Sequence, residues 1–249
     1  MTYSGARVIV TGGASGIGLA TARWFSDRGA AVAVIDRDES LVEGIAGFVA
    51  DVTDDDAVRE AVAAAIAHLG GLDTLVNNAG IGAQGTVEDN DDEEWVRVLD
   101  INLLGLVRVT RACLPALRAS ANASIVNTSS VAATIGLSER ALYSASKGAV
   151  ASLSLAMATD FLREGIRVNC VSPGTTDTPW IGRLLDQSDD SKKERDALKA
   201  RQPHGRLVTA EEIAAAIGYL AGPDSGSTTG TTLFVDGGLT TLCGRPILQ

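Results

Sequence analysis

Short apolar runs rich in β-branched residues recur along the chain and alternate with longer stretches in which apolar residues return every three or four positions. The short runs predict buried strands, and the longer stretches predict amphipathic helices. We expect strands at residues 7–11, 31–36, 47–52, 74–77, 123–128, 167–172 and 231–235. The expected helices lie at about 17–28, 54–68, 92–117, 142–162 and 210–220.

Strands that are apolar on both faces and that alternate with helices are typical of a parallel sheet covered on each side. The sequence therefore predicts an α/β fold of the doubly wound, Rossmann type, with a seven-stranded parallel sheet and helices on both faces. No Pro-rich or low-complexity linker divides residues 1–249, so we expect a single domain. Ligands bind beyond the carboxyl ends of the strands in such sheets, and candidate chemistry is sought there.

Composition and charge narrow the classes of function. Hydrophobic residues make up 45% of the chain and charged residues 21%, which is typical of a well-buried globular protein. The net charge of −10 repels nucleic acid and offers no basic patch to anionic membranes. The chain shows neither a basic start followed by an apolar run nor an apolar stretch of ~20 residues, so we expect a cytoplasmic protein.

Cysteine and histidine give no sign of a metal site. Cys113, Cys170 and Cys243 are odd in number and widely spaced, which predicts buried, inert thiols in a reducing compartment. His68 and His204 are the only histidines and lie far apart. The acidic run at 89–94 precedes a predicted helix and favours a solvated helix start, so no metal is expected.

A glycine-rich turn, TGGASGIG, follows the first predicted strand and opens the first helix. Glycines there permit positive φ and let a pyrophosphate approach the backbone, while the helix start supplies N–H groups. The spacing differs from the common GxGxxG pattern, and a simple tight connection between strand and helix is the alternative. The candidate dinucleotide-binding residues of this turn are Gly12, Ser15, Gly16, Ile17 and Gly18.

Asp36 ends the second predicted strand, where a carboxylate can accept hydrogen bonds from ribose hydroxyls and would repel a 2′-phosphate. This favours NAD over NADP. The neighbouring Arg37 could instead pair with that phosphate, or it could be an exposed charge at the strand end.

Tyr143 and Lys147 lie four residues apart at the start of a predicted helix, and so on one face. Lowering the pKa of a phenol from ~10 to ~7 takes roughly 4 kcal/mol, which Lys147 and the positive charge of an oxidised nicotinamide could supply. Such a pair by itself is usually two exposed side chains without a catalytic role. Here, however, polar residues also follow other predicted strands, as in the segments 77–80, 129–130 and 173–174.

This combination of motifs, which runs from Arg7 to Gly238, resembles the short-chain dehydrogenase/reductase family in its NAD(P)-dependent form. The resemblance implies that Tyr143 is the general acid/base and that Lys147 binds the nicotinamide ribose and lowers the tyrosine pKa. It also implies that Ser130, thirteen positions before the tyrosine, holds the reacting oxygen, and that Asn102 anchors a proton-relay water. Ser129 is then structural.

The resemblance carries over further contacts and an assembly state. Asp51 and Val52 match the adenine-contacting strand end, and Asn78, Ala79 and Gly80 match the segment beside the adenosine ribose. The stretch that grips the carboxamide would be formed by Pro173, Gly174, Thr176 and Thr178. Similar members of the family are commonly homotetramers, so we expect one here.

The insertion at about 178–206 would cover the substrate, and its sequence predicts a charged amphipathic helix or a merely solvated lid. Arg140 and Arg201 suit a carboxylate, because a guanidinium fork pairs with one. They look like the arginines of a branch with cytosolic 3-hydroxybutyrate dehydrogenase and 2-keto-3-deoxy-sugar-acid dehydrogenases, with Arg183 as a third member. The resulting hypothesis is a small hydroxy acid, keto acid or sugar acid.

Three functions stay open at this point. The first is an oxidoreductase that transfers a hydride between NAD and a secondary alcohol or ketone. The second is an NAD-dependent isomerase or epimerase that uses the same tyrosine, and the third is a non-catalytic dinucleotide-sensing protein.

Overall fold

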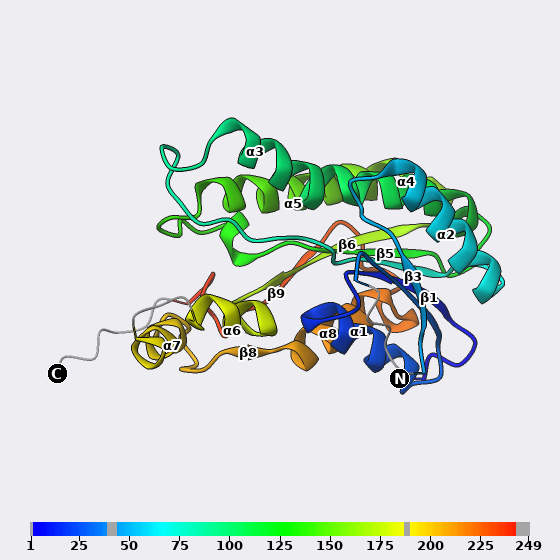
Figure 1. Cartoon of the computed structure of the whole chain (residues 1–249). Helices are drawn as coiled ribbons and strands as arrows, with labels where there is room; N and C mark the ends of the chain where they lie inside the picture. Colours follow the sequence, from blue (N-terminus) through cyan, green and yellow to red (C-terminus); the bar gives the residue numbers. More distant parts are fainter. Residues whose placement is uncertain (1, 39–43, 187–189, 243–249) are drawn as a thin grey trace.

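Seven parallel strands form the central sheet of this computed structural model, which describes residues 2–38, 44–186 and 190–242. The strand order is β3-β2-β1-β4-β5-β6-β9 (Figure 1). The strands span Arg7–Thr11 (β1), Ala31–Asp36 (β2), Ala46–Val49 (β3), Thr74–Asn77 (β4), Ser124–Thr128 (β5), Arg167–Pro173 (β6) and Thr232–Val235 (β9). Every neighbouring pair in the sheet is parallel, which confirms the predicted sheet.

Helices cover both faces of the sheet because the strands are apolar on both. One layer contains α2 (Asp55–Leu69), α4 (Gly105–Arg118) and α5 (Ala141–Asp160), and the other contains α1 (Gly16–Ser26) and α8 (Ala210–Ala221) (Figure 1). Side chains alternate between two cores. Ile9 of β1 belongs to the core beneath α2, α4 and α5, whereas Val8 and Val10 belong to the core beneath α1 and α8.

Two short elements differ from the sequence prediction. β3 ends at Val49 rather than at residue 52, and Ala50 follows it by donating its N–H to the Asp36 carbonyl at 2.9 Å. A second, two-stranded sheet pairs β7 (Thr176–Asp177) with β8 (Val208–Thr209) and was not predicted. Strands of two residues are too short to show any hydrophobic period.

The expected helix at 92–117 is interrupted. It consists of α3 (Asp92–Leu99), a π-helical turn at Asp100–Leu104 and α4. Hydrophobic periodicity does not reveal a single wider turn, because the apolar positions before and after it stay in helical register. π-Helical turns inside α-helices occur frequently at functional sites, and this one contains Asn102.

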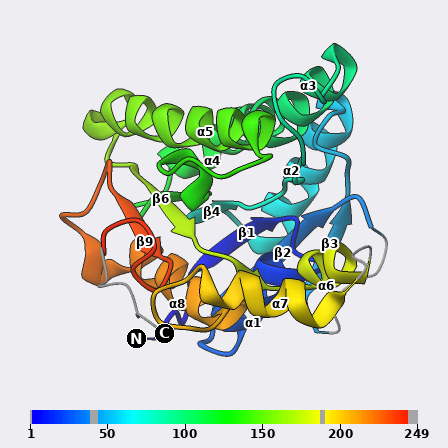
Figure 2. The same ribbon diagram turned by 90° about the vertical axis from the view of Figure 1, so that its left-hand side faces the viewer.

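The insertion at 178–206 forms two helices rather than one. These are α6 (Pro179–Asp186) and α7 (Ser191–Ala200), and the Asp190 side chain caps α7 by accepting the Lys193 N–H at 2.9 Å. Figures 1 and 2 place both helices in the layer of α1 and α8, beyond the end of the sheet. They share a small apolar core formed by Ile181, Leu185, Leu198 and Leu207.

Cys113 and Cys170 are buried free thiols, as predicted, and burial raises the pKa of Cys113 to about 12. Cys243 lies outside the described residues. Within the described ranges, no helix is both long enough and apolar enough to cross a membrane.

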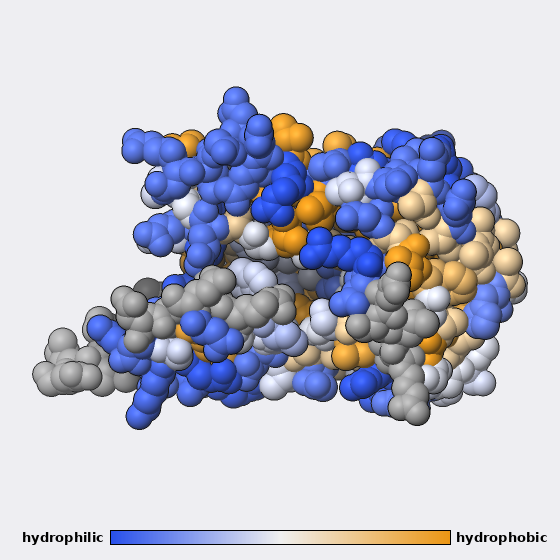
Figure 3. Space-filling model, in the orientation of Figure 1, coloured by the Kyte–Doolittle hydropathy of each residue, from blue (hydrophilic) through white to orange (hydrophobic). Residues whose placement is uncertain are grey.

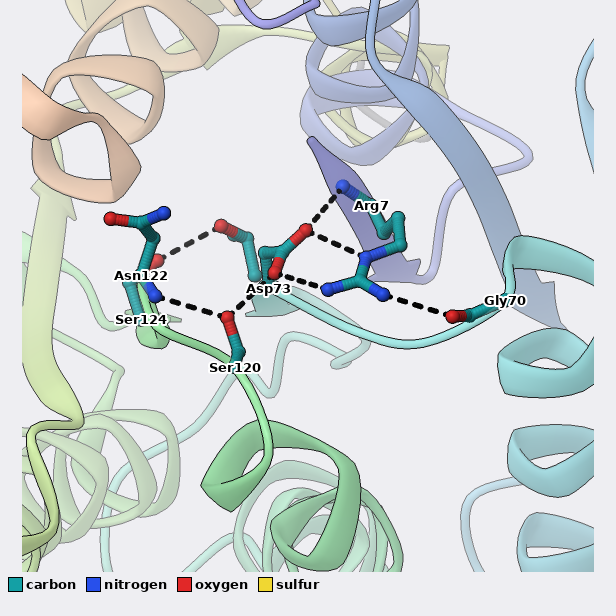
Figure 4. Close-up of polar contacts among 7 residues, drawn as sticks. Arg7, Gly70, Asp73, Ser120, Asn122 and Ser124 are labelled. Atoms are coloured by element: carbon teal, nitrogen blue, oxygen red, sulfur yellow. Dashed lines mark hydrogen bonds and ion pairs between the residues drawn. The ribbon is translucent and has the colours of Figure 1, made fainter. Parts of the chain in front are cut away.

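A network of charged and polar contacts links the amino-terminal ends of β1, β4 and β5 (Figure 4). The Asp73 carboxylate accepts hydrogen bonds from the guanidinium of Arg7 at 2.7 and 2.8 Å and from the Ser120 hydroxyl at 2.6 Å. The Asp73 carbonyl accepts the N–H of Ser124, the first residue of β5. Although burial opposes the shift, the hydrogen bonds from Arg7 and Ser120 hold the pKa of Asp73 below its usual range.

We predict that Asp73→Asn lowers the free energy of unfolding by about 2 kcal/mol at pH 7, because it removes charge-assisted hydrogen bonds. A depressed carboxyl pKa stabilises the fold above the unfolded value of ~3.9, and this contribution is lost as the pH falls through the lower folded pKa. Urea unfolding should therefore show a smaller loss at about pH 3 than at pH 7. The exposed carboxylate variant Glu88→Gln is the control, and an equal loss for Asp73→Asn at both pH values contradicts the account.

Candidate active site

A cavity of about 490 Å³ opens at the carboxyl ends of the strands. Figure 3 shows a hollow on this face between the layer of α3 and α5 and the layer of α6 and α7. Most residues singled out from the sequence line the cavity, namely Gly12, Ser15, Gly16, Ile17, Asp36, Arg37, Asp51, Val52, Asn78, Ala79, Gly80, Ser130, Arg140, Tyr143, Lys147, Pro173, Gly174, Thr176, Thr178 and Arg201.

Three predicted site residues do not contribute a described side chain to the cavity lining. Gly18 lies behind it, where an added Cβ would be 2.0 Å from the Gly12 carbonyl oxygen, so its lack of a side chain lets α1 pack against the loop. Asn102 is buried beside the cavity. The Arg183 side chain lies outside the described part of the chain.

The glycine-rich turn is held against the end of β4. The Asn78 side-chain amide donates to the carbonyls of Thr11 and Gly12, each at 3.2 Å. Gly12 has a φ of +65°, and an added Cβ would be 2.8 Å from the Ala79 Cα. Both its conformation and this close approach require glycine.

The start of α1 suits a phosphate group. Ser15 is the N-cap, its side chain makes no capping hydrogen bond, and the first turn of α1 carries no acidic residue. The first backbone N–H groups of a helix have no partner within the helix, and the helix dipole favours negative charge there. The residues present therefore fit a dinucleotide pyrophosphate.

At the end of β2, the Asp36 carboxylate accepts the Ala14 N–H at 2.9 Å and the Asp38 N–H at 3.1 Å. Its carboxylate thus orients the glycine-rich turn as well as lining the cavity. Hydrogen bonds from Thr53 lower the pKa of Asp51, and the positive charge of Arg37 adds a smaller effect.

Lys147 is a buried cation beside the phenol of Tyr143. Its Nζ donates to the Thr128 carbonyl at 2.9 Å and lies 6.0 Å from the centroid of the Tyr143 ring. Burial disfavours the charged form and lowers the pKa of Lys147 to about 8. The Ser129 hydroxyl donates to the Lys147 backbone carbonyl at 2.8 Å, which fixes the helix turn that carries the lysine.

The pKa of Tyr143 is raised in the chain alone, whereas the expected lowering relies on Lys147 together with an oxidised nicotinamide and stays a prediction. Burial is the main cause, while a hydrogen bond with Ser130 and the positive charge of Arg140 act in the opposite direction. Ser130 is itself held in place, because its Oγ accepts the Ala132 N–H at 3.2 Å.

Asn102 joins the π-helical turn to two neighbouring segments. Its side chain accepts the Ile81 N–H at 2.8 Å and donates to the Ile81 carbonyl at 2.9 Å and to the Ser146 hydroxyl at 3.0 Å. A Cβ on Gly80 would lie 3.1 Å from the Asn102 Oδ1 and 3.4 Å from the Lys147 Nζ. Asn102 therefore positions the segment after β4 close to the lysine.

Two arginines that line the cavity, Arg140 and Arg201, interact electrostatically. Burial lowers the pKa of Arg140, and repulsion from Arg201 lowers it further. Glu139 is the only non-glycine residue with positive φ in the described ranges, at +56°, and its carbonyl accepts the Gly85 N–H at 3.0 Å. Two cations that repel one another across a cavity favour an anion between them.

Sequence reasoning missed the apolar part of the cavity, which includes Leu137, Trp180 and Leu198, and it missed Arg97. Leu137 and Trp180 lie close in sequence to predicted site residues, which is the one available signal. The amphipathic pattern of 178–206 marks apolar positions but does not show which of them face the cavity.

We predict that Lys147→Met raises the free energy of unfolding of the cofactor-free protein by about 1–3 kcal/mol at pH 7, since it removes a buried charge. Between the folded pKa of about 8 and the unfolded value of ~10.4, the unfolded chain binds more protons, so the stability of the parent protein rises with pH. The difference between the two proteins should shrink across that window.

Urea unfolding at several pH values measures this difference. The exposed lysine variant Lys193→Met is the control and should change little. A Lys147→Met protein that is less stable than its parent at pH 7 would show that burial does not penalise this ammonium.

The chain is similar to known proteins over almost its whole length. The family model described as enoyl-(acyl carrier protein) reductase matches residues 12–240. The chain is 38% identical to 2-(S)-hydroxypropyl-CoM dehydrogenase 3 of Xanthobacter autotrophicus, covering 94% of this chain and 96% of the relative. It is 40% identical to cis-4-hydroxycyclohexanecarboxylate dehydrogenase of Sinomonas cyclohexanicum, covering 93% and 95%.

A solved structure is similar over almost the whole length. Ligand-free aldohexose dehydrogenase of Thermoplasma acidophilum superposes with a TM-score of 0.92 at 33% identity, covering 97% of this chain and 96% of that one. The match to the family model, the relatives and the solved structure together show that the chain belongs to the short-chain dehydrogenase/reductase family.

Proposed function

We propose that this protein is an NAD-dependent dehydrogenase/reductase that interconverts a small hydroxy acid and the corresponding keto acid. The observation that carries the proposal is the meeting of three groups in one cavity with the glycine-rich turn. These groups are the Tyr143 phenol, the Ser130 hydroxyl that hydrogen-bonds it, and the buried ammonium of Lys147.

A bound nicotinamide would supply the hydride acceptor for alcohol oxidation and the hydride donor for ketone reduction. In the oxidation direction, Tyr143 takes the proton of the substrate hydroxyl as the carbon loses its hydride, and in reduction it returns that proton. Ser130 donates a hydrogen bond to the reacting oxygen and holds it beside the phenol. Lys147 holds the ribose hydroxyls and favours the phenolate by its charge, and Asn102 anchors the water through which the proton leaves.

NAD is favoured over NADP because Asp36 lines the cavity at the end of β2. A carboxylate there accepts hydrogen bonds from ribose hydroxyls and repels a 2′-phosphate. Arg37 lies near enough to Asp51 to influence its pKa, which gives that guanidinium an acidic neighbour within the chain.

The acid group of the substrate would lie between Arg140 and Arg201, where it relieves their repulsion and accepts charge-assisted hydrogen bonds. One relative is named for a hydroxycyclohexanecarboxylate, an alcohol that carries a carboxylate. This supports an acid as substrate for this chain. Arg183 of α6 is the third candidate for binding the same group.

We also propose that the protein is a cytoplasmic homotetramer. The family resemblance suggests this assembly, and exposed apolar side chains on the layer of α3 and α5 give it a surface to bury. These include Val96, Leu104 and Leu155.

We predict that Tyr143→Phe lowers kcat by about 100- to 10,000-fold, because it removes the group that moves the proton. The dissociation constant for NADH should change little, since the phenyl ring remains. Reduced nicotinamide absorbance measures turnover with NAD and with NADP, and Tyr219→Phe, on the surface of α8, is the control.

Equal rates for the Tyr143→Phe variant and its parent would overturn the mechanism. Conversion of the substrate without net change in nicotinamide redox state would instead indicate an isomerase or epimerase.

We predict that Arg201→Ala raises KM for an acid substrate by about 10- to 100-fold, because a charged hydrogen bond is lost. The KM for a neutral alcohol should stay within about twofold, since it has no partner for the guanidinium. Lys192→Ala removes a positive charge from α7, the helix that ends directly before Arg201, and serves as the control. An unchanged KM for every acid substrate that is turned over would refute the assignment.

A further inference from the structure

The part of the cavity around Ser130 and Tyr143 is largely apolar. Described lining residues here come from the segment 131–140, from α6 and α7, and from Arg201, which directly follows α7. Arg140 and Arg201 are the polar side chains of this set, and Arg97 of α3 also lines the cavity. The other residues of the set are Val131, Leu137, Pro179, Trp180, Ile181 and Leu198. Ile81, after β4, adds a further apolar side chain.

The carboxylates that line the cavity lie far from this part. Asp36 ends β2 and Asp51 follows β3, whereas Ser130 follows β5. In the sheet order, β1 and β4 separate β2 from β5. At ~4.8 Å between neighbouring strands, three steps place Asp36 roughly 14 Å from the strand that carries Ser130.

Trp180 and Gly82 close the apolar part from two sides. A Cβ on Gly82 would lie 2.4 Å from the Trp180 Cζ2, so the indole of α6 rests directly on the backbone of the segment after β4. Both residues line the cavity, and Trp180 is 40% exposed. A substrate bound beneath the indole would bury the remaining apolar surface of that ring.

We propose that the substrate carries its acid group on an apolar body, such as a saturated ring or hydrocarbon chain with a single reacting hydroxyl or keto group. This rests on the proposed function, which it deepens by excluding polyhydroxylated sugar acids. Trp180, Leu137 and Gly82 are then the residues that determine this specificity.

The physical reason is the cost of burying hydroxyl groups. Each further hydroxyl of a sugar acid gives up its hydrogen bonds to water, and the described apolar wall offers it no side-chain partner. The guanidinium groups of Arg140 and Arg201 are engaged by the acid. A hydrocarbon body instead gains free energy by leaving water.

Three ring compounds distinguish the proposal of an acid substrate from the proposal of an apolar body. Cyclohexanecarboxylate has the acid and the apolar body, quinate is the same ring acid with several hydroxyl groups, and cyclohexanecarboxamide is the neutral counterpart. Calorimetric titration of the NADH-bound protein should show that cyclohexanecarboxylate binds about 100-fold more tightly than quinate and about 10-fold more tightly than the carboxamide. Binding is measured, so the result does not depend on turnover.

The outcomes are distinct. Quinate binding as tightly as cyclohexanecarboxylate overturns the apolar-body proposal and leaves the acid proposal standing. Equal binding of the carboxamide and cyclohexanecarboxylate overturns the acid proposal, and absence of binding by all three compounds overturns both.

Variants of Trp180 and Gly82 test whether these residues determine the specificity. Trp180→Ala should reduce the preference for cyclohexanecarboxylate over quinate to about 10-fold or less, and Trp180→Phe should keep most of it. Gly82→Ala should act like Trp180→Ala, because its methyl group displaces the indole. Gly136→Ala is the control, since nothing lies within 4 Å of its added Cβ. An unchanged preference in Trp180→Ala, with unchanged NADH affinity, contradicts the assigned role of the indole.

Discussion

The burial of a single cation, Lys147, is the interaction on which the site depends. Its ammonium is held by one backbone carbonyl, that of Thr128 at the end of β5, and lies beside the Tyr143 ring. Burial lowers the pKa of the lysine and raises that of the phenol, so the protein holds both groups in positions where their charged forms are poorly solvated. The ammonium of Lys147 favours the phenolate form of Tyr143, and the positive charge of a bound NAD⁺ would favour it further. Proton transfer by Tyr143 would therefore depend on the bound cofactor.

The sheet topology divides the cavity by chemistry. The strand order reverses between β1 and β4, and the Gly12 turn and Asn78 meet at that point through hydrogen bonds. On the side of β2 and β3, the cavity presents Asp36 and Asp51, and on the side of β5 and the insertion it presents an apolar wall with Arg140 and Arg201. The proposed nucleotide-binding and substrate-binding parts of the cavity thus lie at the ends of different strands.

Local patterns predicted the fold and much of the cavity lining, because the strands are apolar on both faces and the motifs follow strand ends. The π-helical turn could not be predicted, since the hydrogen bonds of Asn102 join it to Ile81 and Ser146, which are distant in sequence. The same limit applies to Trp180, whose contact with Gly82 joins residues 98 positions apart. The start of α7 has a local signal, the capping residue Asp190, which the sequence interpretation did not use. The effect of burial on the Tyr143 pKa could not be predicted, because sequence spacing brings charges together but does not show how much water is excluded.

The ionisation of Tyr143 with NAD⁺ bound tests the central claim most directly. Ultraviolet difference spectra recorded across a pH titration detect tyrosinate, and the chain has only three tyrosines. In the parent protein with NAD⁺, the account predicts that one tyrosine ionises well below the usual pKa of ~10 and that Tyr143→Phe loses this transition. Identical titrations of the two proteins with NAD⁺ would contradict it.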